Sequence, residues 1–182
     1  ELKGKFAPSQ TLKISEALKD GKTASADGGK YIFTPDKDEK NWRLEKFGAD
    51  DKLDFSKVFE GKQLSAGEFD LNANGQKATL QDGKIYKAEL SFTPSNQGGG
   101  ANSELDALKK VFEESFEKGA KALLIAKNLK QEGNSYSYNY VYKIEDDGNG
   151  KLDQGDIKLL GVVNTNNGSQ NNYDITAVNA EL

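Results

Sequence analysis

Residues 145–156, EDDGNGKLDQGD, are the stretch of this sequence whose residue spacing most restricts the local fold. A calcium ion takes six to eight oxygen ligands, and a twelve-residue loop can supply them from positions 1, 3, 5, 7, 9 and 12, with glycine at position 6 for a sharp turn. The oxygen positions hold Glu145, Asp147, Asn149, the carbonyl of Lys151, Asp153 and Asp156. Gly150 falls at the turn, so the spacing predicts a calcium site.

This stretch resembles the calcium loops of EF-hand and dockerin proteins, with two departures. Position 1 is Glu145 where those loops have Asp, and Asp146 is the alternative ligand in a register shifted by one residue. Tyrosines alternate with mostly polar residues over 136–144, which indicates a strand before the loop and not an entering helix. We therefore expect the loop to join two strands. A metal-free acidic turn is the competing interpretation, since Asp, Asn and Gly are also the residues of ordinary turns.

Composition restricts the chemistry that the chain can support. The sequence contains no Cys, no His and no Met, which excludes a thiol nucleophile, a histidine base and zinc sites built from thiolate or imidazole. Oxygen ligands remain, and these suit Ca²⁺ or Mg²⁺. A net charge of −4 argues against a basic surface that binds nucleic acid. No apolar run is long enough to span a membrane.

The chain of 182 residues suits a single domain, 1–182, and alternatively two lobes, 1–93 and 103–182, on either side of a Gly-rich connector. Short apolar runs behind Gly and Asp turns predict strands in the first half, most regularly over 84–93. Leu12 and Leu18 allow a short helix over 10–20.

The second half predicts one clear helix followed by strands. Ser103 is a suitable N-cap, and the apolar stripe that follows predicts a helix over 103–118. Strands are expected over 121–129, 136–145 and 157–163. The predicted fold class is α+β and β-rich, an antiparallel sandwich or roll with one helix packed on the sheet.

Two separated pieces of the sequence resemble a known family. Residues 46–56, KFGADDKLDFS, are similar to a short sequence motif found at the ends of calcium-dependent repeats in secreted bacterial RTX proteins. Residues 138–163 resemble a tyrosine-rich strand, an acidic loop and a Leu-Xaa-Gly-Val strand in the C-terminal tails of RTX adhesins and surface-layer (S-layer) proteins. The glycine-rich nonapeptide array of that family is missing, which argues against a parallel β-roll.

The resemblance implies a non-enzymatic, calcium-stabilised structural or adhesive module of a secreted or cell-surface bacterial protein. Such proteins leave the cell by type I secretion and fold outside it. Asp50, Asp51 and Asp54 would then bind a second ion, although acidic residues before a strand are commonly just solvated. The implied partners are other domains of the same surface protein, and alternatively a cell-surface glycan or protein.

Both ends of the sequence bear on export. Residues 159–182 contain no Lys or Arg, as in uncleaved type I secretion signals, and a polar final strand would look the same. The chain begins at Glu1 without Met, which favours a domain excised from a longer protein.

Two other classes of function stay open. A carbohydrate-binding module would use Trp42 and exposed tyrosines of 136–142 as stacking platforms, although tyrosines on one strand face more often belong to the core. A glycoside hydrolase needs a pair of carboxylates, but among 29 Asp and Glu residues no spacing singles one out. We expect that the chain is not an enzyme.

Overall fold

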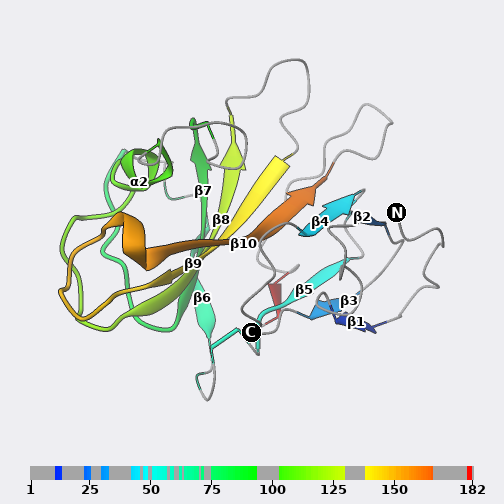
Figure 1. The fold of residues 1–182 in the computed structure, drawn as a ribbon, viewed down its shortest axis with the longest axis horizontal. Coiled ribbons are helices and arrows are strands. Elements are labelled where there is room, and N and C mark those ends of the chain that lie inside the picture. The colour runs from blue at the N-terminus through cyan, green and yellow to red at the C-terminus, as the bar shows by residue number, and fades with distance from the viewer. Residues whose placement is uncertain are drawn as a thin grey trace. The chain divides into compact units, whose positions relative to one another are not determined.

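The structure is a computed structural model, and most of what it describes is strand. It describes residues 11–13, 23–25, 30–32, 42–45, 47–48, 51–56, 58–59, 62, 64–69, 71, 75–93, 103–129, 138–165 and 180–181. The strands are β1 (Thr11–Lys13), β2 (Thr23–Ser25), β3 (Lys30–Ile32), β4 (Trp42–Glu45), β5 (Lys52–Asp54), β6 (Ser65–Phe69), β7 (Lys84–Leu90), β8 (Lys121–Asn128), β9 (Tyr138–Glu145), β10 (Ile157–Asn164) and β11 (Ala180–Glu181) (Figure 1). The helices are α2 (Ser103–Leu108) and a 3-10 turn, η2 (Gln154–Asp156).

The chain divides into two compact units. Unit 1 comprises residues 1–64, 137–139 and 160–182, and unit 2 comprises 65–136 and 140–159. This division differs from the two lobes, 1–93 and 103–182, that the sequence offered as an alternative to a single domain. The reason is that β7, before the connector, pairs with β8, after it, so both strands belong to unit 2.

The strands of unit 1 alternate between two sheets along the sequence. One sheet has the order β1-β3-β5-β11, and β2, β4 and β10 are consecutive in the order of the other. All of these pairs are parallel, with Thr11 opposite Lys30 and Thr23 opposite Arg43. Parallel pairs therefore form in this chain without a glycine-rich nonapeptide array.

Unit 2 contains the strand order β9-β8-β7-β6, with β6, β7 and β8 parallel. Parallel neighbours need a long crossover connection, and α2 lies on the crossover between β7 and β8. β9 is the neighbour of β8 in the sheet, and Lys121 at the start of β8 pairs with Glu145 at the end of β9. The prediction of an antiparallel sheet is wrong for the seven strand pairs with a described register, all of which are parallel.

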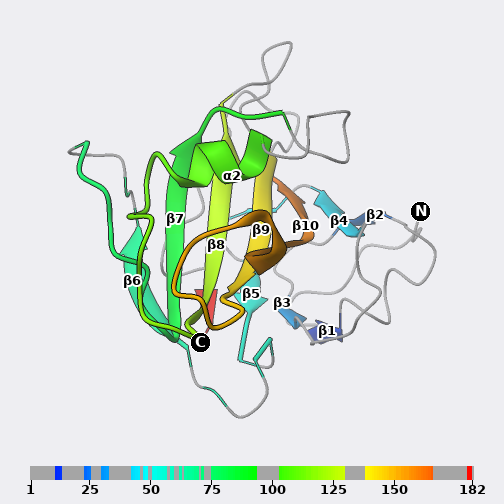
Figure 2. The ribbon, with the colours of Figure 1, turned by 60° about the vertical axis from the view of Figure 1, so that its left-hand side comes forward.

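The predicted helix at 103–118 begins at Ser103 but ends at Leu108. Its continuation is diverted, because Phe112 forms a parallel bridge with Ala78 and Ser115 forms an antiparallel bridge with Lys151. The apolar stripe still enters the core: Leu105, Leu108, Val111 and Phe112 are buried. Figure 2 shows α2 lying over the strands of unit 2, and Glu104 on α2 accepts a hydrogen bond from the Tyr142 hydroxyl on β9.

The β-rich α+β character of the chain is confirmed. Predicted strands at 84–93, 121–129, 136–145 and 157–163 correspond to β7, β8, β9 and β10. The short helix considered for 10–20 is wrong at its start, where Thr11–Lys13 is a strand. Within the described residues no helix combines the length and apolar character that crossing a bilayer requires.

Candidate metal centre

The loop at 145–156 joins β9 to β10, as predicted, and lies in unit 2. Backbone hydrogen bonds join the loop to the segment that precedes β8. The N–H of Phe116 donates to the carbonyl of Gly150 at 3.1 Å, and the N–H of Leu152 donates to the carbonyl of Glu114 at 3.2 Å. The N–H of Asp146 donates to the carbonyl of Ala120 at 3.0 Å. These backbone contacts hold the loop against a part of the chain that is distant in sequence.

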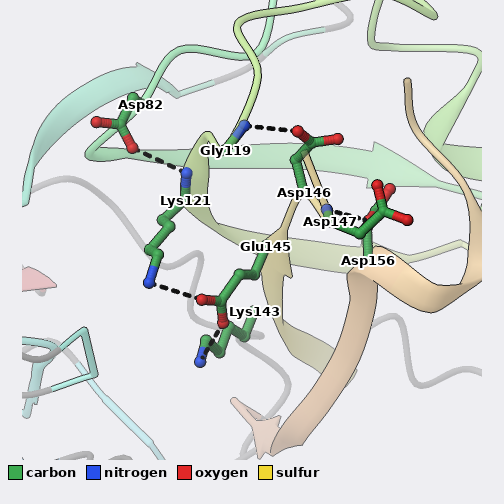
Figure 3. A network of polar contacts seen from close by, with 8 residues as sticks. All are labelled: Asp82, Gly119, Lys121, Lys143, Glu145, Asp146, Asp147 and Asp156. Carbon is green, nitrogen blue, oxygen red and sulfur yellow. Dashed lines mark hydrogen bonds and ion pairs between the residues drawn. The ribbon is translucent and has the colours of Figure 1, made fainter. Parts of the chain in front are cut away.

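Asp146 is the buried carboxylate at the start of the loop. It accepts a hydrogen bond from the N–H of Gly119 at 2.6 Å (Figure 3). It also accepts the N–H groups of Gly148 and Gly150, each at 3.0 Å. Burial alone would raise its pKa, but hydrogen bonds from four backbone N–H groups outweigh burial and hold the pKa below the ordinary value of 3.8. Asp146 is therefore ionised and organises the turn around itself.

Asp156 approaches the same place from the other end of the loop. Its carboxylate accepts the N–H of Asp147 at 3.1 Å and the N–H of Asp153 at 2.9 Å, and Asp153 caps η2 in return. Burial raises the pKa of Asp156, and the negative charges of Asp153 and Asp146 raise it further. Together these effects outweigh the backbone hydrogen bonds, which lower the pKa. One carboxylate oxygen each from Asp146, Asp147 and Asp156 lies within 4.8 Å of the others. Three acidic groups thus converge.

The remaining predicted ligands of the loop contact each other. The side-chain nitrogen of Asn149 donates to Asp153 at 3.1 Å, and the Asn149 oxygen accepts the N–H of Lys151 at 2.6 Å. Asp153 also accepts the N–H of Gly155 at 2.9 Å. Asp153 is not a member of the group of three converging carboxylates.

Glu145 lies at the end of β9 and forms ion pairs. Its carboxylate lies 2.6 Å from the ammonium of Lys121 and 2.7 Å from that of Lys143 (Figure 3). Hydrogen bonds from these two lysines lower its pKa from the ordinary value of 4.5. Of the two alternatives for the first ligand position, Glu145 and Asp146, Asp146 belongs to the group of three converging carboxylates, together with Asp147 and Asp156.

We expect Glu145→Gln to leave the response of the protein to Ca²⁺ intact. The ion pairs are partly exposed, so the substitution should lower the free energy of unfolding by less than about 1 kcal/mol. Glu89→Gln is the matched control, because Glu89 forms a comparable exposed pair with Lys127 at 3.0 Å. Urea unfolding with and without Ca²⁺ measures both effects. Loss of the calcium response in Glu145→Gln, but not in Glu89→Gln, would make Glu145 a ligand.

The residues proposed for a second ion have local roles in unit 1. Asp51 is buried and accepts the N–H of Gly48 at 2.7 Å. Asp54 is also buried and accepts the N–H and the hydroxyl of Ser56 at 3.0 and 2.5 Å. Asp50 lies outside the described residues. Within the described part of the chain, the one group of three or more acidic residues that could hold a metal is the group in the loop.

Sequence reasoning did not anticipate the partners of the loop. Gly119 donates to Asp146, and Lys121 and Lys143 pair with Glu145. Asp82 accepts the N–H of Lys121 at 2.9 Å and so orders the start of β8 (Figure 3). The positive φ of Gly119, 75°, agrees with glycine there, but nothing in the local pattern links these residues to the loop.

Comparison of the chain with protein-family models, with curated proteins and with solved structures finds no match.

Proposed function

We propose that this chain is a calcium-binding structural module in which the loop at 145–156 holds the ion. The observation that carries the proposal is the convergence of Asp146, Asp147 and Asp156 within 4.8 Å. Two like charges about 4 Å apart repel by roughly 1 kcal/mol in water and by roughly 4 kcal/mol near a protein surface. A divalent cation would remove this repulsion, and carboxylate oxygens are the ligands that Ca²⁺ prefers.

Asn149, Asp153 and the carbonyl of Lys151 are candidates to complete the ligand shell. Asn149 and Asp153 would have to exchange their mutual hydrogen bond for the ion. Both bond to neighbours within the loop, and Asn149 is exposed, so this exchange would leave the core unchanged. We favour Ca²⁺ over Mg²⁺ because Ca²⁺ accepts irregular shells of varied size, whereas Mg²⁺ demands a near-ideal octahedron.

Ion binding would act on folding. The loop connects β9, β10 and the segment before β8, so an ion bound to the native loop stabilises all three against the unfolded chain. The gain is about 2.7 kcal/mol at a hundredfold excess of ion over the dissociation constant. Together with the resemblance to RTX and surface-layer proteins, this supports a non-enzymatic adhesive or structural module that is exported unfolded and folds in calcium outside the cell.

Carbohydrate binding is the weaker proposal. A stacking platform needs exposed aromatic rings, but Tyr140 and Tyr142 are buried and pack edge-on against Phe92 at 5.4 and 6.2 Å. The Tyr142 hydroxyl is bound to Glu104. These tyrosines therefore serve the core of unit 2. The side chain of Trp42 lies outside what the structure describes.

Thermal unfolding with chelator and with a series of Ca²⁺ concentrations tests the proposal. We expect a rise in Tm of roughly 5–10 °C at a hundredfold excess over the dissociation constant. Asp147→Asn and Asp156→Asn together should abolish the rise, because two of the three converging charges are lost. Asp106→Asn removes an exposed charge on α2 and should keep it. A full calcium response in the double variant would mean that the loop is an acidic turn without an ion.

A further inference from the structure

We propose that Asn149 is a site of self-modification: its side-chain amide reacts with the backbone nitrogen of Gly150 when the loop opens and is protected while the loop is closed. The protection follows from the hydrogen bonds of the loop. The additional dependence on Ca²⁺ rests on the proposed function.

The chemistry needs only the Asn149–Gly150 pair and water. The backbone nitrogen of Gly150 attacks Cγ of Asn149, an approach that glycine leaves open because it has no Cβ. A bond forms between that nitrogen and Cγ, the Cγ–Nδ2 bond breaks, and ammonia leaves with the proton of the backbone amide. Water then opens the resulting succinimide at either of its two carbonyl groups. The product is aspartate or isoaspartate, and no oxidant or reductant takes part.

The closed loop restrains the nucleophile. The N–H of Gly150 is buried and donates to both oxygens of Asp146, at 3.0 and 3.2 Å. The attacking nitrogen must lose its proton, and the adjacent carboxylate opposes this because it would place a second negative charge beside the first. The two hydrogen bonds of the closed loop therefore keep the N–H of Gly150 directed at the carboxylate of Asp146.

The closed loop also restrains the group that is attacked. The amide plane of Asn149 is held through its oxygen, by the N–H of Lys151 at 2.6 Å, and through its nitrogen, by Asp153 at 3.1 Å. Attack requires the face of this plane to meet the nitrogen of Gly150, and the two hydrogen bonds restrict the rotation of the plane. Asn149 is exposed, so water already reaches it in the closed loop, which protects Asn149 by restraining the reacting groups and not by excluding water.

The two products differ in their effect on the loop. Isoaspartate routes the main chain through Cγ and lengthens it by one methylene, which displaces Gly150 from Asp146 and from its backbone bond to Phe116. Aspartate keeps the main chain and adds an oxygen ligand. Reaction in an open loop would therefore disable part of the molecules permanently.

The test follows Asn149 by peptide mapping, with chromatographic separation of aspartate and isoaspartate, during incubation at mildly alkaline pH. Three samples are compared: native protein with chelator, native protein with millimolar Ca²⁺, and protein unfolded in concentrated urea. We expect Asn149 to react at least about tenfold more slowly in the native protein than in urea, since an opening free energy of about 1.4 kcal/mol already gives this factor. Calcium should slow the native reaction further.

Variants separate the contacts. Asp153→Ala releases the Asn149 nitrogen and should speed the native reaction several-fold, whereas Asp106→Ala, on exposed α2 surface, should leave it unchanged. The isoaspartate fraction, separated from the unmodified protein, should lose the calcium-dependent rise in Tm.

Equal rates in native and urea-unfolded protein would overturn the proposal, as would an unchanged rate in Asp153→Ala. Slow native reaction without any effect of Ca²⁺ would support the protection by the loop and count against calcium binding.

Discussion

Replacing Asp146 with alanine should lower the free energy of unfolding by about 3–5 kcal/mol in the absence of any added cation. The substitution removes a buried carboxylate that accepts N–H groups of Gly119, Gly148 and Gly150. Hydrogen bonds to charged groups contribute about 1.5–3 kcal/mol each, and the buried N–H of Gly150 would be left without an acceptor. Urea unfolding in chelator measures the loss. Asp147→Ala, at an exposed carboxylate of the same loop, is the control and should cost far less.

The effect of Asp146 should also depend on pH. Its pKa is lowered on folding, so its contribution is complete above the ordinary value of 3.8 and is lost as the pH falls through the lower folded value. The stability difference between the wild type and Asp146→Asn should therefore shrink below about pH 4. A difference that stays constant into strong acid would show that ionised Asp146 is not what holds the loop.

Gly150→Ala should lower the free energy of unfolding by about 2–4 kcal/mol. Gly150 has φ of 73°, a left-handed conformation that costs an L-residue about 1–2 kcal/mol. An added Cβ would also lie 3.1 Å from the carbonyl oxygen of Phe116 and 3.1 Å from Cγ of Lys118. The backbone of Phe116 is bonded to Gly150 itself and cannot move away without breaking that bond, so overpacking adds to the strain.

Gly119→Ala is the matched control for Gly150→Ala. Gly119 has φ of 75°, close to that of Gly150, but no atom within 4 Å of an added Cβ, so it tests the backbone strain without the contact. The difference between the two variants, measured by urea unfolding, isolates the close approach of Phe116. Equal losses in both would mean that the loop moves freely away from the segment before β8.

Local patterns predicted the elements of unit 2 well. The alternation of Tyr86, Ala88 and Leu90 places β7, and the Asp, Asn and Gly residues after Ile144 place the loop between β9 and β10. These features depend on residues within a few positions of each other. Chain reversal and side-chain alternation are properties of such short segments, which is why they can be read from sequence.

The helix shows where local patterns stop being sufficient. Apolar residues continue at helical spacing as far as Phe116, yet α2 ends at Leu108. The backbone beyond it pairs with Ala78 and Lys151, which are remote in sequence. The parallel direction of β6, β7 and β8 was missed for the same reason, since alternation specifies a strand and its buried face but not the direction of its neighbour.

For the candidate site, the local pattern alone shows which acidic residues are available and predicts that they lie in one tight loop between strands. Which of their carboxylates come within 4.8 Å of one another depends on contacts with segments remote in sequence. Asp146 is buried and accepts the backbone N–H of Gly119, while Glu145 forms an ion pair with Lys121 on the neighbouring strand, β8. Glu145 and Asp146 have nearly the same local sequence. They differ in role because folding brings different hydrogen-bond donors to each of them. A buried carboxylate needs such donors to remain charged, so the partners, and not the spacing, select the members of the site.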